Sequence, residues 1–222
     1  AGGGSFEPKK PNINNLEKYS KHVSYSIDKI NRFKDKDIVI LGGGDSALDW
    51  TIQLSEIAKS LTLIHRRDNF RGSPATVNKV MDLRDNGDLK FYVGQVTDLI
   101  GDDTDLKSVY VNMKDKEFQI PCDILMPFFG LTMSLGPLVE WQLELAEDRI
   151  AVNTETFQTN LPGIYAVGDI NTYPGKLKLI LSGFHETALM AHAAFKYMNP
   201  DERLTLQYTT TSSSLQKKLL AQ

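Results

Sequence analysis

The chain has 222 residues, of which 41% are hydrophobic, and its 25 basic residues nearly balance 28 acidic ones, for a net charge of −3. This length can form one large domain or two smaller ones. The charge balance provides no basic field for nucleic acid, and no run approaches the roughly 18 apolar residues of a membrane span, so we expect neither partner. The single cysteine, Cys122, cannot form an intrachain disulfide or a multi-thiolate metal site, and we expect a buried, inert thiol and no bound metal.

The first 36 residues show little regular patterning. Glycines and prolines are frequent in residues 1–11, as in a flexible lead. Scattered apolar residues from Leu16 to Phe33 predict a short extended piece and then a partial helix.

From Asp37 onward the pattern predicts a strand, a tight turn and a helix. Apolar residues 38–41 are followed by three glycines, and apolar side chains then recur at helical spacing to Ala58. The turn fits the dinucleotide fingerprint G-x-G-x-x-A, in which the first glycine permits the turn, the second admits a pyrophosphate and the alanine lets the helix pack closely. We expect Asp45 or Ser46 to cap the helix, whose N-terminal amides would bind the pyrophosphate. The expected contacts are Gly42, Gly43, Gly44, Asp45, Ser46 and Ala47.

The next strand indicates which nucleotide is bound. Residues 61–64 complete a βαβ unit, and His65, Arg66, Arg67 and Arg71 follow where an NAD-binding protein places an acidic residue for the ribose. Guanidinium groups there favour a 2′-phosphate, so the sequence predicts NADP(H). The alternatives are an ordinary strand-to-helix turn and arginines that only solvate a loop.

The following elements extend this domain. We expect a helix over residues 77–83, ending near Asn86 and Gly87, and a third parallel strand over residues 89–93. Alternating polar and apolar residues from Gln95 to Ile120 predict an antiparallel meander, with its aspartate-rich segment 102–105 at a solvated hairpin tip rather than in a calcium loop. An apolar strand over residues 124–130 would close the domain.

Beyond a boundary near residues 131–137, the pattern is less regular. We expect a short strand over residues 150–152, a buried strand that ends at Gly168 and Asp169, and a closely packed helix over residues 179–198. The polar tail, residues 204–222, has the composition of a partly disordered segment.

Together, residues 42–47, 65–71 and 163–170 resemble the two-dinucleotide flavoprotein reductases of the thioredoxin-reductase type. The C-x-x-C pair of thioredoxin reductases is missing around residues 22–26, which excludes thiol–disulfide exchange. The chain most resembles the ferredoxin:NADP reductases of this type, and its glycine-rich start and the segment 168–176 are similar to theirs.

This resemblance implies an α/β fold in which residues 1–6 cross over from an FAD domain, residues 7–131 form a Rossmann-like NADP(H)-binding domain, and residues 132–222 form the C-terminal part of the FAD domain. The family's first half, with its own glycine fingerprint, has no counterpart here, so the chain looks like the C-terminal two thirds of such an enzyme. The FAD contacts implied are Phe6, Gly168, Asp169, Ile170, Tyr208 and Thr211.

The implied activity is hydride transfer between NADP(H) and FAD, with single electrons exchanged with ferredoxin, in a cytoplasmic homodimer. Because the cofactors supply the chemistry, no catalytic acid, base or nucleophile is expected. Surface lysines, among them Lys9, Lys10, Lys176 and Lys178, would attract an acidic ferredoxin. The alternatives are an NADP-binding module without activity and a reductase of another acceptor, such as flavodoxin or a quinone.

Overall fold

The computed structural model describes residues 5–114, 116–204, 210, 212 and 217–219. The chain divides into two compact units, one formed by Glu7–Thr132 and the other by Ala1–Phe6 with Met133–Gln222. We call these the central unit and the C-terminal unit. The chain passes between them within the strands β1 (Ser5–Pro8) and β9 (Leu131–Ser134), which pair in a two-stranded sheet.

A four-stranded parallel sheet organises the central unit. Its order is β4-β3-β2-β8, with β2 at Asp37–Leu41, β3 at Ser60–His65, β4 at Lys90–Val93 and β8 at Ile124–Pro127. Residues 38–41 and 61–64 are buried and apolar except for Thr62, as expected for strands covered on both faces. The carboxyl ends of β2 and β3 lie together at one edge of the sheet.

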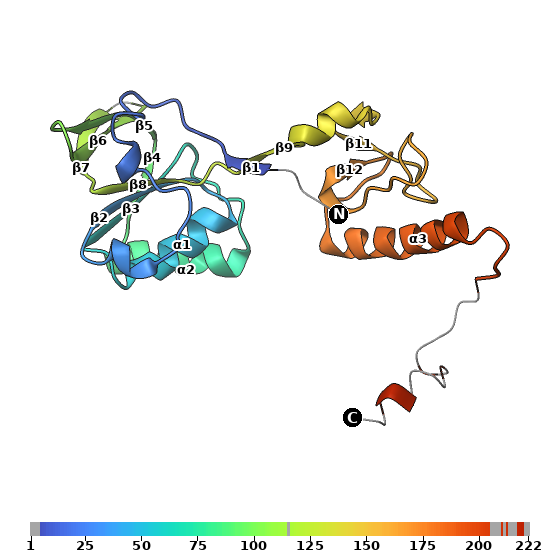
Figure 1. Ribbon diagram of the computed structural model, residues 1–222. Coiled ribbons are helices and arrows are strands. Elements are labelled where there is room, and N and C mark those ends of the chain that lie inside the picture. The colour runs from blue at the N-terminus through green and yellow to red at the C-terminus, as the bar shows by residue number, and fades with distance from the viewer. Residues whose placement is uncertain (1–4, 115, 205–209, 211, 213–216, 220–222) are drawn as a thin grey trace. The chain divides into compact units, whose positions relative to one another are not determined.

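Different layers cover the two faces of this sheet. Ile38 and Ile40 pack with the helices α1 (Asp45–Ser55) and α2 (Pro74–Asn86), whereas Val39 and Leu41 pack with the antiparallel meander. The meander consists of β5 (Gln95–Gly101), β6 (Leu106–Met113) and β7 (Lys116–Pro121). Figure 1 shows both helices on one side of β2 and β3 and the meander on the other. The predicted α/β class, with a parallel sheet and an antiparallel meander, is confirmed.

The ends of the two helices follow local chemistry. The expected cap at Asp45 or Ser46 is wrong: α1 starts one residue earlier than that requires, with Gly44 as N-cap and no side-chain cap. Asp45 instead lies in the first turn, where the positive end of the helix dipole stabilises its carboxylate. In α2, the Ser73 hydroxyl accepts a hydrogen bond from the Thr76 N–H, and the helix ends as predicted at Gly87, in the left-handed conformation.

The segment before β2 does not form the predicted partial helix. The helical structure within residues 16–33 consists of two 3₁₀ turns, η1 (Ser20–His22) and η2 (Ile30–Phe33). Its apolar side chains anchor it singly instead of forming a helical stripe: Tyr19 and Phe33 are buried, and Val23 forms a parallel bridge with Leu125 of the sheet.

The C-terminal unit has little regular structure before its helix. It contains η3 (Gly136–Trp141), η4 (Gly168–Ile170), α3 (Ile180–Met198) and a three-stranded sheet of β10 (Leu145–Ala146), β11 (Arg149–Ala151) and β12 (Asn171–Thr172). Its core comprises Leu135, Leu143, Ile150, Ala166 and Ile170.

Two expectations for this unit are wrong. The buried strand before Gly168 is reduced to one bridge between Gln158 and Tyr165, because no neighbouring strand among the described residues pairs with it over a longer stretch. Helix α3 forms as predicted, but it is not closely packed: Glu186 is its one fully buried residue, and Ile180 is 83% exposed. Across the described part of the chain, no helix combines the length and apolar character needed to cross a bilayer.

Candidate functional site

Three glycines form the turn between β2 and α1, and each meets a different environment. Gly42 has φ +145°, and a Cβ there would lie 2.7 Å from the Phe128 carbonyl oxygen and 3.0 Å from the Ala47 Cβ. A Cβ at Gly43 would collide with the His65 ring, whereas a Cβ at Gly44 would meet nothing within 4 Å. The turn thus packs tightly at Gly42 and Gly43 and is open at Gly44.

The start of α1 continues this open surface. Ala47 is fully buried, and this allows the helix to approach the sheet. Asp45 and Ser46 are exposed in the first turn. The first N–H groups of a helix have no partner within the helix and carry partial positive charge, so this end favours an anion.

The basic cluster after β3 is tied to the glycine turn through the backbone. The Arg71 N–H donates a hydrogen bond to the Gly43 carbonyl oxygen at 2.7 Å, and Gly44 and Arg71 form a parallel bridge. Arg66, Arg67 and Arg71 are exposed. Within the described ranges the ion pairs made by arginine belong to Arg32 and Arg84, so these three guanidinium groups are available to a ligand.

His65 lies between the glycines and the arginines. Its half-buried ring stacks on Phe70, with ring centroids 5.7 Å apart. Burial, and next the positive charge of Arg66, lower the pKa of His65 below its ordinary value, while a hydrogen bond with the Asn69 backbone opposes this shift. The imidazole is therefore neutral at pH 7 unless an anion binds next to it.

These groups share one cavity of about 780 Å³. It brings together seven of the predicted residues: Gly42, Gly43, Gly44, His65, Arg66, Arg67 and Arg71. Asp45, Ser46 and Ala47 are not part of its lining. The sequence reasoning did not assign Phe128, Phe129 and Gly130 to the site, although they line the cavity and follow the strand beside β2, a position that could have indicated them.

The predicted flavin contacts belong to the C-terminal unit. Gly168, Asp169 and Ile170 form η4, with Gly168 at φ +82°. Ile170 is buried, Asp169 is exposed, and the Asp169 carbonyl oxygen accepts a hydrogen bond from Arg149 Nε at 3.0 Å. Phe6, in β1, is 51% exposed. Tyr208 and Thr211 lie outside the described residues.

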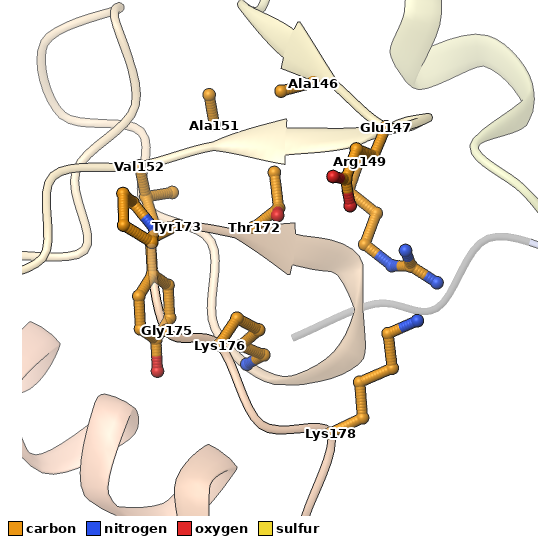
Figure 2. Close-up of a pocket in the computed structure, with 11 residues that line it drawn as sticks. Ala146, Glu147, Arg149, Ala151, Val152, Thr172, Tyr173, Gly175, Lys176 and Lys178 are labelled. Atoms are coloured by element: carbon orange, nitrogen blue, oxygen red, sulfur yellow. The ribbon is translucent and has the colours of Figure 1, made fainter.

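A second cavity, of about 520 Å³, lies in the C-terminal unit. Figure 2 shows Tyr173 on one side and, on the other, Arg149 and Lys178, whose charged ends point toward one another. The expectation that Lys176 is a surface lysine is wrong: its side chain is only 6% exposed and is paired with Glu186, a residue that the sequence reasoning missed. A lone glutamate in a helical pattern gives no signal that it is buried.

Two further observations concern the metal-ligating side chains and the cysteine. No cluster of three or more His, Cys, Asp or Glu side chains in the described part of the chain could hold a metal ion. Cys122 is buried as expected, and burial raises the pKa of its thiol far above the ordinary range.

Comparison with known proteins places this geometry in a family. The profile of a family described as pyridine nucleotide-disulphide oxidoreductase matches residues 1–194, which include both sets of predicted contacts except Tyr208 and Thr211. The chain belongs to this family. The resemblance to pyridine nucleotide-dependent flavoprotein reductases is therefore confirmed.

Proteins similar to this chain include relatives named ferredoxin–NADP reductase. The protein from Parvibaculum lavamentivorans is 58% identical over 221 residues, and that from Mesorhizobium japonicum is 57% identical over the same length. Each alignment covers 99% of this chain and 64% of the relative, so the chain spans slightly less than two thirds of the length of these proteins.

Solved structures of other proteins share the fold. Thioredoxin reductase from Lactococcus lactis aligns with a TM-score of 0.69 over 88% of this chain and 64% of its own, and that from T. acidophilum with 0.70 over 89% and 64%. Both are 24% identical in sequence, so they support the fold alone.

Proposed function

We propose that this chain forms the NADP(H)-binding domain and part of the FAD-binding domain of a ferredoxin–NADP reductase. The observation that carries the proposal is the cavity in which the glycine turn meets Arg66, Arg67 and Arg71. The names of relatives that are 57–58% identical support the same activity.

The residues of the cavity fit a 2′-phosphorylated dinucleotide. The open side of Gly44 leaves room for a pyrophosphate against the backbone, and the N-terminus of α1 favours its charge. The exposed guanidinium groups of Arg66, Arg67 and Arg71 are suited to paired, charge-assisted bonds with the 2′-phosphate. His65 would add a further donor on protonation.

The C-terminal unit fits part of a flavin site. The exposed Asp169 carboxylate can accept hydrogen bonds from the ribityl hydroxyls, and Phe6, Gly168 and Ile170 are proposed neighbours. We assign Tyr208 and Thr211 to the flavin site on the family resemblance. A flavin held by these residues would supply the redox chemistry that links a two-electron hydride donor such as NADPH to a one-electron carrier.

The protein's own groups bind and orient in this reaction. The glycine turn and the arginines hold the adenosine end of the nucleotide, and Asp169 holds the flavin side chain. No protein group needs to exchange a proton with the substrate. We further propose that ferredoxin is the electron-transfer partner and that the enzyme is a cytoplasmic homodimer.

Replacing the two adjacent arginines tests the choice of nucleotide. Arg66→Ala with Arg67→Ala should weaken NADPH binding roughly a hundredfold and NADH binding much less, because about 1.5–3 kcal/mol is lost for each hydrogen bond to a charged group. Dissociation constants for both nucleotides, from fluorescence titration, measure this difference.

The matched control is Arg32→Ala with Arg84→Ala, which removes two arginines of the same unit that do not line the cavity. It should leave both affinities unchanged. Equal losses for NADPH and NADH in the Arg66 and Arg67 variant would overturn the 2′-phosphate assignment.

A further inference from the structure

Glu186 is a buried carboxylate that collects four hydrogen bonds from one loop. It is 0% exposed on α3, and the donors all come from residues 168–176, which we call the 168–176 loop. The Gly168 N–H donates to Oε2 at 2.7 Å and the Asn171 Nδ2 at 3.0 Å. The Tyr173 hydroxyl donates to Oε1 at 2.9 Å, and Lys176 Nζ donates to the same oxygen.

Lys176 closes the arrangement around Gly168. Its ammonium group also donates to the Gly168 carbonyl oxygen at 2.9 Å. The N–H of Gly168 is therefore held by Glu186 and its carbonyl by Lys176. Gly183 of α3 also lies against Gly168, since a Cβ at Gly183 would be 3.6 Å from the Gly168 Cα.

Glu186 is ionised although it is buried. Burial of the Glu186 carboxyl opposes its ionisation, but hydrogen bonds from Lys176, Gly168, Tyr173 and Asn171 outweigh burial and hold its pKa below the ordinary value. Burying two charges has a large desolvation cost, so such a pair is weak evidence of a stabilising role. A role in fixing a particular backbone geometry accounts for its presence better.

The pair fixes the backbone conformation next to Asp169. The neighbouring peptide is held at Gly168, and the Asp169 carbonyl is held by Arg149. The hydrogen bonds between described residues leave the exposed Asp169 carboxylate unused. Glu186, Lys176 and Arg149 thus hold the backbone of the loop, while the Asp169 carboxylate remains available to a ligand.

We propose that Glu186, acting through Lys176 and the Gly168 peptide, is a positioning residue that orients Asp169 for contact with the flavin. This inference rests on the proposed function, because it assigns a role toward the flavin to a residue that does not touch it. Figure 2 shows Tyr173 and Lys176, two of the four donors, at the edge of the cavity beside β12.

The test compares variants of the holoprotein that weaken the pair to different degrees. Tyr173→Phe removes one donor, Glu186→Gln removes the charge, and Glu186→Gln with Lys176→Met removes both charges and avoids an unpaired buried ion. The measurements are the FAD dissociation constant, the visible absorption spectrum of the bound flavin, the dissociation constant for NADP⁺ and the thermal midpoint.

We expect Glu186→Gln and the double variant to weaken FAD binding about tenfold or more and to alter the flavin spectrum, because the loop loses buried hydrogen bonds that hold it in place. Tyr173→Phe should have a smaller effect in the same direction. The NADP⁺ dissociation constant should stay within about twofold of the wild type, since every residue that lines its cavity belongs to the central unit.

Two controls separate positioning from stability. Glu140→Gln removes an exposed carboxylate in the same unit and should change nothing. Leu143→Ala removes a core side chain of that unit and should lower the thermal midpoint while leaving the flavin spectrum as in the wild type.

The outcomes distinguish the two proposals. Wild-type FAD affinity and spectrum in the Glu186 variants, with flavin bound by the wild type, would overturn the positioning role alone. A wild-type protein that binds no FAD would overturn the proposed function and the positioning role with it. If Glu186→Gln does not fold, the double variant and Tyr173→Phe decide between these outcomes.

Discussion

Gly44→Ala should weaken nucleotide binding without unfolding the protein. The added Cβ at this position would meet nothing within 4 Å, and the backbone at Gly44, with φ −102° and ψ 177°, is accessible to alanine. The new methyl group would occupy the open side of the turn, where we place the pyrophosphate. The substitution therefore acts on the ligand and not on the fold.

The structure determines the expected changes in stability and in nucleotide affinity. Gly→Ala at a compatible backbone position stabilises by about 0.4–1 kcal/mol, whereas alanine is worse than glycine as an N-cap by about 0.5–1 kcal/mol. The two effects oppose each other, so stability should change by less than about 1 kcal/mol. A methyl group that prevents close approach removes charge-assisted hydrogen bonds from backbone to phosphate, each worth about 1.5–3 kcal/mol. The loss of NADPH affinity should be about tenfold to a hundredfold.

Gly42→Ala is the matched comparison two residues away. Its φ of +145° is strained for alanine, and the new Cβ would lie 2.7 Å from the Phe128 carbonyl oxygen. Backbone strain and overpacking each cost about 1–3 kcal/mol. This variant should lose stability and nucleotide binding together, whereas Gly44→Ala should lose only binding.

Isothermal titration with NADPH and urea unfolding of the same preparations measure the two quantities. NADPH affinity at the wild-type level in Gly44→Ala, with the protein folded, would refute the approach of a pyrophosphate to this glycine. A Gly44→Ala protein destabilised as much as Gly42→Ala would refute the description of the turn as open at Gly44.

The remaining predictions concern pH and helix capping. Because the pKa of His65 is lowered in the folded state, the unfolded chain binds the proton more tightly, so this residue should make the protein less stable as pH falls below the ordinary histidine pKa of about 6.5. His65→Gln should reduce that loss in unfolding measured between pH 7.5 and 5.5, and an unchanged pH profile would contradict the shift. Ser73→Ala removes the side-chain cap of α2 and should cost about 1 kcal/mol in urea unfolding, while Ser24→Ala, in a loop of the same unit, should cost less; equal costs would contradict the capping role.

The βαβ part of the central unit could be predicted because its signals are local. Strand β2 is a continuous apolar run, the glycines follow directly, and the helical spacing of α1 begins at once. The basic cluster could be assigned because chain order alone places it at the carboxyl end of β3, next to the glycine turn. Local sequence patterns were therefore sufficient to predict these residues of the cavity.

The remaining features depend on contacts that a sequence pattern does not contain. The N-cap of α1 falls on Gly44, because the backbone path of the turn and not the best capping side chain determines where the helix begins. The pairing of Glu186 with Lys176 joins residues ten apart across a loop whose course had to be known first. The apolar residues of α3 predict a packed helix, but exposure depends on which neighbours the chain supplies, and Phe184 is 69% exposed.

The discrimination between NADP⁺ and NAD⁺ by the wild-type protein tests the central claim most directly. The two ligands differ only in the 2′-phosphate that we assign to Arg66, Arg67 and Arg71. Titration of both under identical conditions should give a dissociation constant for NAD⁺ at least about a hundredfold larger than that for NADP⁺. Equal dissociation constants, or no binding of either nucleotide, would contradict the account.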